Sequence, residues 1–188
     1  MKAFIDHWSE TLQDQNYRDF KSKMAQKEVA AGKVPPQNLD AEKSLLGAVL
    51  IDEEVLADVS EHVTGKDFYD KRHAAIYDAM MRLFEHHKPV DLLTLTDELK
   101  KKDELDIIGG STYLSELTNY VPTAAHAEAY AEIVAQRAVR RRLIKASAEI
   151  SELGYDEEFN VQELLEKAEA ELFSVSDTSL KQDLTSIE

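Results

Sequence analysis

The amino-acid sequence predicts an all-α protein, in which a compact helical head is followed by a protruding long helical hairpin. Three observations support this fold class. Glycine and proline number only 6 and 4 among 188 residues, which leaves few turns and argues against a β architecture. Apolar residues recur at three- and four-residue spacing along most of the chain. The stretch from Thr123 to Leu153 contains neither glycine nor proline, as one long helix requires.

The first element is predicted in residues 1–24, as an amphipathic helical extension. Three large apolar side chains recur at i, i+4 and i+8 and would share one helix face: Phe4, Trp8 and Leu12. Two interpretations stay open. The helix docks on its own domain, or it inserts into a groove on a neighbouring subunit or partner. Residues 25–38 are predicted to be a linker, because they end in the stiff pair Pro35-Pro36 and a capping residue.

The head is predicted over residues 39–122 as a set of short helices. The expected helices cover residues 39–50, 53–62, 70–87, 95–102 and 111–119. Asn38 is expected to cap the first helix and Asp52 the second, since their side-chain oxygens can accept hydrogen bonds from free backbone N–H groups. Thr94 with Asp97 resembles a capping box that would start the fourth helix. Gly109-Gly110 is expected to break the chain before the fifth.

The hairpin is predicted over residues 123–175. Its second arm, residues 161–175, would begin at a cap formed by Asn160 and Glu163. The apolar residues of the two arms are expected to form either the hairpin's own core or a seam between subunits, because two helices alone bury few residues. These residues are Leu143, Ile144, Ile150, Leu164, Leu165, Leu172 and Phe173. Residues 176–188 are rich in Ser, Thr and Asp and are predicted to be a linker.

One basic cluster lies on the predicted first arm of the hairpin. It consists of Arg137, Arg140, Arg141, Arg142 and Lys145. The favoured interpretation is a solvated stripe that pairs with Glu163, Glu166 and Glu169 on the second arm, since runs of charge usually form solvated faces. The alternative is a contact for an acidic partner or for DNA.

The sequence offers no set of residues with the spacing of a catalytic, cofactor or metal site. His86 and His87 would point about 100° apart on a helix and could not converge on a metal ion. His73 is interpreted as a packing histidine rather than as a catalytic base. Gly32-Lys33 lacks the other residues of a phosphate-binding loop. A small helical hydrolase with an unrecognised site remains a rival prediction, which assays for turnover would test.

Charge and hydropathy exclude other classes. The net charge of -15 argues against a nucleic-acid-binding surface, because DNA affinity depends on Lys and Arg displacing counterions from phosphates. No apolar run approaches the ~18 residues of a membrane span, and the charged start from Met1 to Glu10 is unlike a signal peptide. The absence of cysteine fits a reducing compartment. We therefore expect a cytoplasmic protein that binds neither DNA strongly nor membranes.

A series of short motifs resembles the amino-terminal domain of bacterial DnaB-type replicative DNA helicases. It opens with the stretch from Val34 to Gly47, and the resemblance extends to Val175. The further motifs, in chain order, are Phe68-Tyr69, Arg72-His73, Ile76-Tyr77, Pro89-Val90-Asp91, Leu95, Leu99, Gly109-Gly110, Tyr113-Leu114, Leu117, Tyr130, Ile133-Val134 and Arg142-Leu143-Ile144. Each motif alone is weak, and their order and spacing together are specific. His126 stands where the family pattern leads us to expect Asn.

The resemblance implies an oligomerisation and docking collar rather than an enzyme. Hairpins would pair between subunits, the pairs would close a ring as a trimer of dimers, and the collar would bind the carboxy-terminal domain of primase and a helicase loader. The family's motor domain, with its ATP and Mg²⁺, is expected to follow, but no Walker A sequence occurs before Glu188. ATP-dependent DNA unwinding is thus expected of the parent helicase. A rival hypothesis makes residues 1–23 a partner-derived helicase-binding peptide joined to this domain.

Overall fold

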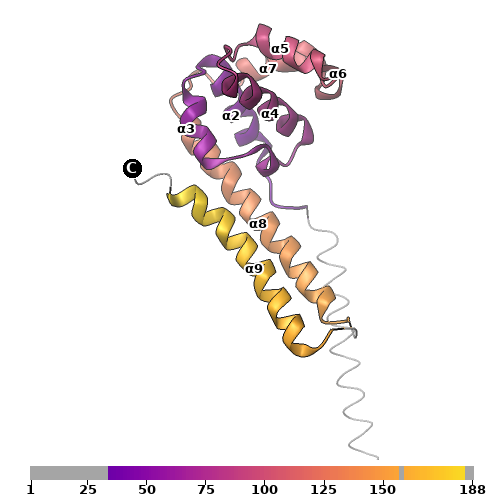
Figure 1. The fold of residues 1–188 in the computed structure, drawn as a ribbon. Coiled ribbons are helices and arrows are strands. Elements are labelled where there is room, and N and C mark those ends of the chain that lie inside the picture. Colours follow the sequence, from indigo (N-terminus) through magenta and orange to yellow (C-terminus); the bar gives the residue numbers. More distant parts are fainter. Residues whose placement is uncertain (1–33, 157–158, 185–188) are drawn as a thin grey trace, which may run out of the picture. The chain divides into compact units, whose positions relative to one another are not determined.

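The computed structural model describes residues 34–156 and 159–184, with side chains up to Ser176. By its internal contacts the chain divides into residues 1–35 and residues 36–188, and the description below concerns the second unit. The predicted docking helix with Phe4, Trp8 and Leu12 lies outside the described residues. Every regular element of the described part is helical, which confirms the predicted fold class (Figure 1).

The head consists of short helices, and two long helices follow it. In chain order the elements are α2 (Leu39–Ile51), α3 (Val55–His62), the 3₁₀ turn η1 (Gly65–Asp67), α4 (Lys71–Glu85), α5 (Leu92–Lys101), α6 (Leu105–Ile108), α7 (Gly110–Thr118), α8 (Ala127–Leu153) and α9 (Val161–Leu184). The two shortest elements, η1 and α6, were not predicted from the sequence. Both are single turns, too short to show a hydrophobic period.

Asn38 caps α2 as predicted, whereas Asp52 does not cap α3. Asn38 Oδ1 accepts a hydrogen bond from the backbone N–H of Ala41 at 3.1 Å, as an N-cap should. Asp52 Oδ1 accepts from the Glu54 N–H at 3.1 Å, but α3 begins only at Val55. Asp52 therefore closes the turn between α2 and α3 and does not cap the helix itself.

Helix α5 begins three residues earlier than predicted, because its cap is Asp91 and not Thr94. The Asp91 carboxylate accepts from the N–H groups of Leu93 and Thr94 at 2.9 and 2.8 Å, and the Thr94 hydroxyl accepts from the Asp91 N–H at 3.1 Å. Asp97, which was expected to complete the box, instead pairs with Lys101 at 2.5 Å along the helix. The acidic and hydroxyl residues of a capping box have exchanged their usual places, which misled the sequence-based assignment.

Replacing Asp91 by alanine is expected to lower the free energy of unfolding by about 1 kcal/mol near neutral pH, the usual cost of losing an N-cap. The hydrogen bond from the Thr94 N–H lowers the pKa of Asp91 below the ordinary value of 3.8. The ionised carboxylate is thus the stabilising form, so its contribution is present above pH 3.8 and is lost as the pH falls through the lowered pKa. Urea unfolding of parent and D91A proteins should therefore give midpoints that converge in acid. An equal difference between the two urea midpoints near neutral pH and in acid would contradict this prediction.

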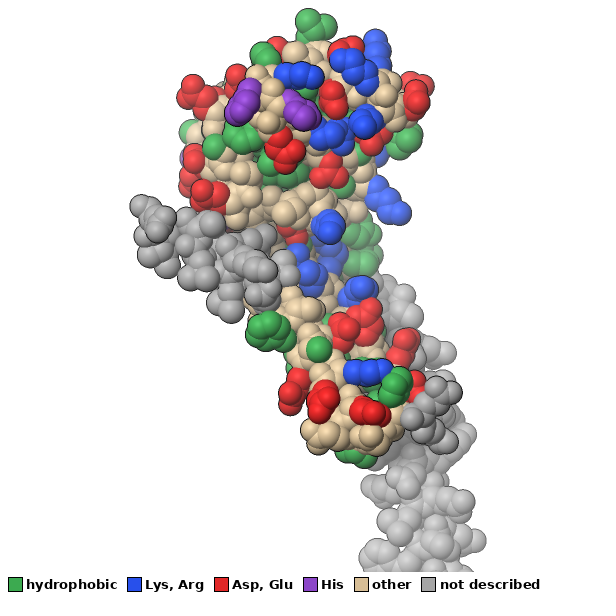
Figure 2. All heavy atoms as spheres, viewed as in Figure 1, with side chains coloured by type: hydrophobic (Ala, Val, Ile, Leu, Met, Phe, Trp, Pro, Cys, Tyr) green, Lys and Arg blue, Asp and Glu red, His purple; other side chains and the backbone are tan. Residues whose placement is uncertain are grey.

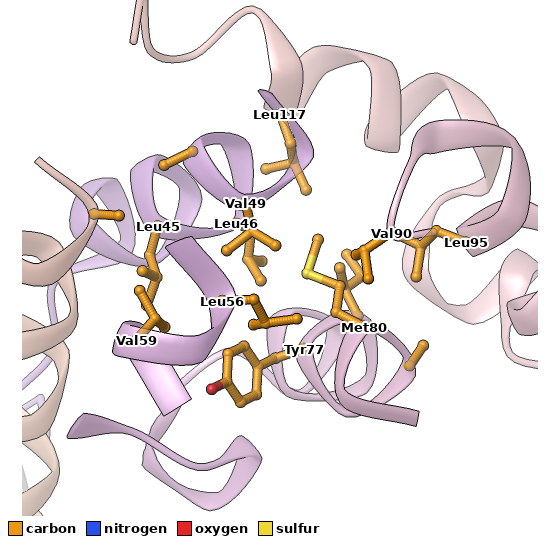
Figure 3. Packing of buried hydrophobic residues seen from close by; sticks show 14 of the residues in the cluster. Leu45, Leu46, Val49, Leu56, Val59, Tyr77, Met80, Val90, Leu95 and Leu117 are labelled. Carbon is orange, nitrogen blue, oxygen red and sulfur yellow. The ribbon is translucent and has the colours of Figure 1, made fainter. Parts of the chain in front are cut away.

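The hydrophobic core lies inside the head and continues into the first half of α8. Figure 3 shows side chains of α2, α3, α4 and α5 meeting there, among them Leu46, Leu56 and Met80, all fully buried. Helix α2 also lies very close to α7: a Cβ added at Gly47 would stand 2.3 Å from the backbone oxygen of Leu117. Only glycine fits at this contact, so position 47 sets the distance between the two helices.

The hairpin arms are α8 and α9, which pack side by side along their length (Figure 1). The predicted cap of α9 is confirmed: Asn160 Oδ1 accepts from the Glu163 N–H at 3.0 Å, and Glu163 accepts from the Asn160 N–H at 3.1 Å. Helix α9 continues to Leu184, beyond the end expected at residue 175. The polar residues after 175 suggested a linker, but they include no glycine or proline to stop the helix. No helix of the described residues is long and apolar enough to cross a membrane.

Candidate functional site

The hairpin presents apolar side chains to solvent, several of them among those predicted for a seam. On α8, Leu143 is 48% exposed, and Ile150, one heptad further on, is half-buried. On α9, Leu165 and Leu172 are 55% and 48% exposed and are also seven residues apart. Residues at this spacing share a helix face, so each arm carries an apolar stripe that the other arm covers only in part. Leu165 and Leu172 stay about half exposed, and Leu143 lies beside the buried Ala146.

The remaining seam residues lie in different environments. Leu164 is half-buried, and so are Ala168 and Glu171, four and seven residues further along the same face of α9. Ile144 and Phe173 are 57% and 68% exposed, but each is one residue, about 100° of helix rotation, from its neighbour on the stripe. The structure therefore brings Leu165 and Leu172 onto one face and places Phe173 on another. Figure 2 shows apolar side chains standing out between charged ones on the hairpin.

Two residues of the basic cluster, Arg141 and Arg142, contact the head and not the acids of α9. Arg141 Nη1 donates to the backbone oxygen of Pro36 at 2.8 Å, and its Nη2 donates to that of Asp67. Arg142 Nη1 pairs with the Asp67 carboxylate at 2.5 Å. Burial lowers the pKa of the Arg141 guanidinium from its ordinary value. Figure 2 shows Lys and Arg side chains gathered where the hairpin leaves the head.

The predicted pairing of the cluster with Glu163, Glu166 and Glu169 is wrong for the described side chains. Glu163 caps α9, and Glu166 accepts from the Gln162 amide at 3.2 Å. Lys145 pairs with Glu149 on its own helix at 3.3 Å. The reason is helix phase: positions 141 and 142 follow Ala138 by three and four residues and so continue the face that α8 turns toward the head. Arg137 and Arg140 have no ion-pair partner among the described residues.

A buried polar network at the centre of the head was missed from the sequence. The Glu42 carboxylate lies 2.6 Å from His73 Nδ1, and His73 Nε2 lies 2.6 Å from the Tyr113 hydroxyl. Glu42 also accepts from the N–H groups of Tyr69 and Asp70 at 2.7 and 3.3 Å. Glu42 and His73 are 1% and 0% exposed. The network joins α2, α4 and α7 to the segment that follows η1.

His73 was predicted to be a packing residue, and its burial agrees with that. The available signal for its partner was the position of Glu42, which precedes Leu45, Leu46 and Val49 by three, four and seven residues. A carboxylate on that apolar face must find buried donors. The Glu42 oxygens are occupied by the donors named above, and burial raises the pKa of the Tyr113 hydroxyl. We therefore assign the network to structure.

The hairpin also encloses an open hollow near its turn, with a volume of about 560 Å³. Its lining is mostly acidic and comes from both arms, including Glu149 and Glu152 of α8 and Glu171 of α9. Among the side chains that the structure describes, no three of His, Asp or Glu come together as a metal site would need. The prominent features of the described chain are thus its apolar hairpin stripes and the arginine contacts at their base.

Comparison with known proteins identifies the domain. The family pattern described as DnaB-like helicase N terminal domain matches residues 34–136, more than half of the chain. The chain belongs to the DnaB-like helicase N-terminal domain family. This confirms the resemblance seen in the sequence. The matched residues include all of the head and the start of α8, up to residue 136.

Relatives and solved structures agree with the DnaB assignment. The replicative DNA helicase DnaB of Leifsonia xyli subsp. xyli is 46% identical over 151 residues, which are 80% of this chain and 33% of that protein. The chain thus spans about a third of the length of this curated relative. The crystal structure of the N-terminal domain of DnaB helicase from Mycobacterium tuberculosis is 40% identical, with a TM-score of 0.72, and covers 75% of this chain and 99% of that one.

A second solved structure shares the fold at lower identity. It is described as a DnaB-like replicative helicase and its interactions with primase. It is 22% identical, with a TM-score of 0.62, and the alignment covers 80% of this chain and 36% of that one. At this identity the likeness concerns the DnaB N-terminal fold alone.

Proposed function

We propose that this DnaB-like domain is a collar that joins helicase subunits through its hairpin and offers its surface to primase and to a helicase loader. The observation that carries the proposal is the pair of apolar stripes on the two hairpin arms, in a chain whose relatives are replicative helicases. The activity is binding. ATP hydrolysis and DNA unwinding, with ATP and Mg²⁺, would belong to other parts of a longer protein, since the chain matches only a third of its relatives.

The hairpin stripes favour self-association over a solvated state. Leu165 and Leu172 on α9, with Leu143 on α8, leave about half of each side chain in water. Apolar side chains repeated every seven residues along two arms form the kind of surface that helices use to pair. A second copy carries the same stripes, and two-fold pairing of hairpins would cover both at once. Pairs closing into a ring would then give the trimer of dimers that the family resemblance implies.

The mass of the chain in solution tests self-association. Light scattering over a wide concentration range should give the mass of a dimer or of a larger assembly at high concentration, falling toward the 21.3 kDa of one chain on dilution. Pairing through apolar stripes should persist in high salt, because it depends little on charge. A constant mass of one chain up to millimolar concentration would reject the hairpin seam.

Primase docking is the second part of the proposal. It is supported by the DnaB-like replicative helicase of known structure whose interactions with primase have been described and whose fold this chain shares. Titrating the chain with the carboxy-terminal domain of primase, followed by calorimetry, should give saturable binding. The matched control is the same primase domain with a different all-α protein of similar net charge. Equal heats in both titrations would reject docking on this domain.

The acidic surface should keep single-stranded DNA from adhering to the collar. The chain carries a net charge of -15, and like charges repel the phosphate backbone. Two of the five residues in its basic cluster are already engaged with the head. Fluorescence anisotropy of labelled oligo-dT should therefore stay constant as this protein is added at physiological salt. Tight binding under those conditions would sink the idea.

A further inference from the structure

Helix α8 meets the head through two different kinds of contact. The first is a row of small side chains, in which Ala127, Ala131, Val134 and Ala138 are all buried. Tyr130 and Ile133 are partly buried against the same core beside this row. This apolar contact supports the helix, but it is not directional, so it fixes the direction of the helix less closely than hydrogen bonds do.

The second contact is polar and directional, and it begins one turn after Ala138. Arg141 reaches two backbone oxygens of the head, those of Pro36 and Asp67. Arg142 adds a charge-assisted bond of 2.5 Å to the Asp67 carboxylate. Two adjacent guanidinium groups therefore bind Asp67, and one of them also binds Pro36, at the point where α8 leaves the head. Hydrogen bonds of this kind fix orientation more closely than apolar contacts do.

The acceptors at Asp67 are held in place by further hydrogen bonds within the head. Asp67 is 1% exposed, and its second carboxylate oxygen accepts from the N–H and the hydroxyl of Thr64 at 2.8 and 3.0 Å. Just after it, the N–H groups of Tyr69 and Asp70 bind Glu42. The segment that Arg141 and Arg142 grip is thus fixed on its other side by the buried Glu42–His73–Tyr113 network. Through Arg141 and Arg142, the base of the hairpin is therefore bound to a residue, Asp67, that the head itself holds in place.

We propose that Arg141 and Arg142 form a latch, which sets the direction in which the hairpin leaves the head. With the latch open, the small-residue contact lets α8 tilt while the head stays folded. The proposal goes beyond the collar function, because it concerns the geometry of a single chain and holds whether or not hairpins pair. It assigns the two arginines a positioning role at the base of the hairpin.

A distance measurement within one chain tests the latch. The protein has no cysteine, so Leu93→Cys on α5 and Tyr155→Cys after α8 provide two labelling sites in an otherwise cysteine-free chain. Both native side chains are nearly four-fifths exposed, at 79% and 78%. Spin labels at these positions report the distance between head and hairpin turn by double electron–electron resonance. Doubly labelled chains are diluted in excess unlabelled chain, so that distances between copies do not contribute.

The informative variant carries Arg141→Gln and Arg142→Gln together. We expect a broader distance distribution with a shifted centre, while far-ultraviolet circular dichroism keeps its helical signal. Arg140→Gln is the matched control, because Arg140 is a neighbouring, exposed arginine without a partner among the described residues, and it should reproduce the parent distribution. A parent-like distance distribution in the folded double variant would overturn the latch. The direction of the hairpin would then be set by the row of small side chains on α8.

If the double glutamine variant does not fold, a second pair of substitutions tests the latch instead. Arg141→Lys with Arg142→Lys keeps both charges but removes the fork that binds two acceptors at once. A broadened distribution in this variant supports the latch, and a parent-like one rejects it. The distance distribution of the diluted, labelled chains tests the latch alone, and the mass of the parent chain in solution tests the collar proposal alone. The two failures are therefore distinguishable.

Discussion

Aspartate at both Leu165 and Leu172 is expected to turn an assembling chain into a monomer. The two side chains lie seven residues apart on α9 and are about half exposed, so they would be buried only in a pair. About half of each side chain remains to be buried, which is worth roughly 1 kcal/mol. Two-fold pairing counts each substitution twice, for a loss of about 4 kcal/mol. That corresponds to a dissociation constant about three orders of magnitude weaker. Sedimentation equilibrium of parent and L165D/L172D proteins measures it.

The control for this variant is Gln162→Asp, which adds charge to an exposed polar position of the same helix. Its mass should follow that of the parent. Thermal unfolding at a concentration where the parent is monomeric should show L165D/L172D close to the parent, because neither leucine belongs to the core of one chain. An L165D/L172D protein that still assembles like the parent would show that the seam lies elsewhere on the domain.

Alanine at Glu42 is expected to lower the free energy of unfolding by roughly 3 kcal/mol or more, because each buried donor left without its acceptor costs about 1–3 kcal/mol. His73, the Tyr69 N–H and the Asp70 N–H would lose their acceptor in a site closed to solvent. The measurement is the urea midpoint at constant slope. Glu54→Ala is the matched control, because Glu54 is an exposed glutamate and its loss should change stability by less than about 0.5 kcal/mol. Equal midpoints for E42A and E54A would contradict the structural role of the network.

The sequence predicted what depends on local signals. Helical periodicity and the scarcity of glycine and proline identified an all-α chain, and the caps at Asn38 and Asn160 lie where expected. The start of α5 was wrong because Asp91 and Thr94 offer two overlapping capping signals within four residues, and the helix uses Asp91 as its cap. The end of α9 was wrong because a polar composition does not by itself stop a helix.

Long-range polar contacts could not be predicted from this single sequence. Glu42 meets His73 across 31 positions, and Arg142 meets Asp67 across 75. Neither spacing carries a periodic signal, because the partners belong to elements that tertiary packing brings together. The basic cluster was recognised as a cluster, but Arg141 and Arg142 both bind Asp67 in η1, an element too short to predict. The apolar residues of the hairpin were identified from the sequence. Which of them are covered and which are exposed depends on tertiary packing and required the structure.

Helix α8 spans the head and the hairpin without interruption, so it works as a lever. From Ala138 to Leu153 it extends about 22 Å past its last contact in the small-residue row, at 1.5 Å per residue. A tilt of only about 10° at the base would then move the hairpin turn by about 4 Å, given that length. Small rearrangements around Pro36 and Asp67 are therefore magnified at the far end. Conversely, a force applied at the hairpin turn would act on the contacts at Pro36 and Asp67 with the full length of this part of α8 as its lever arm.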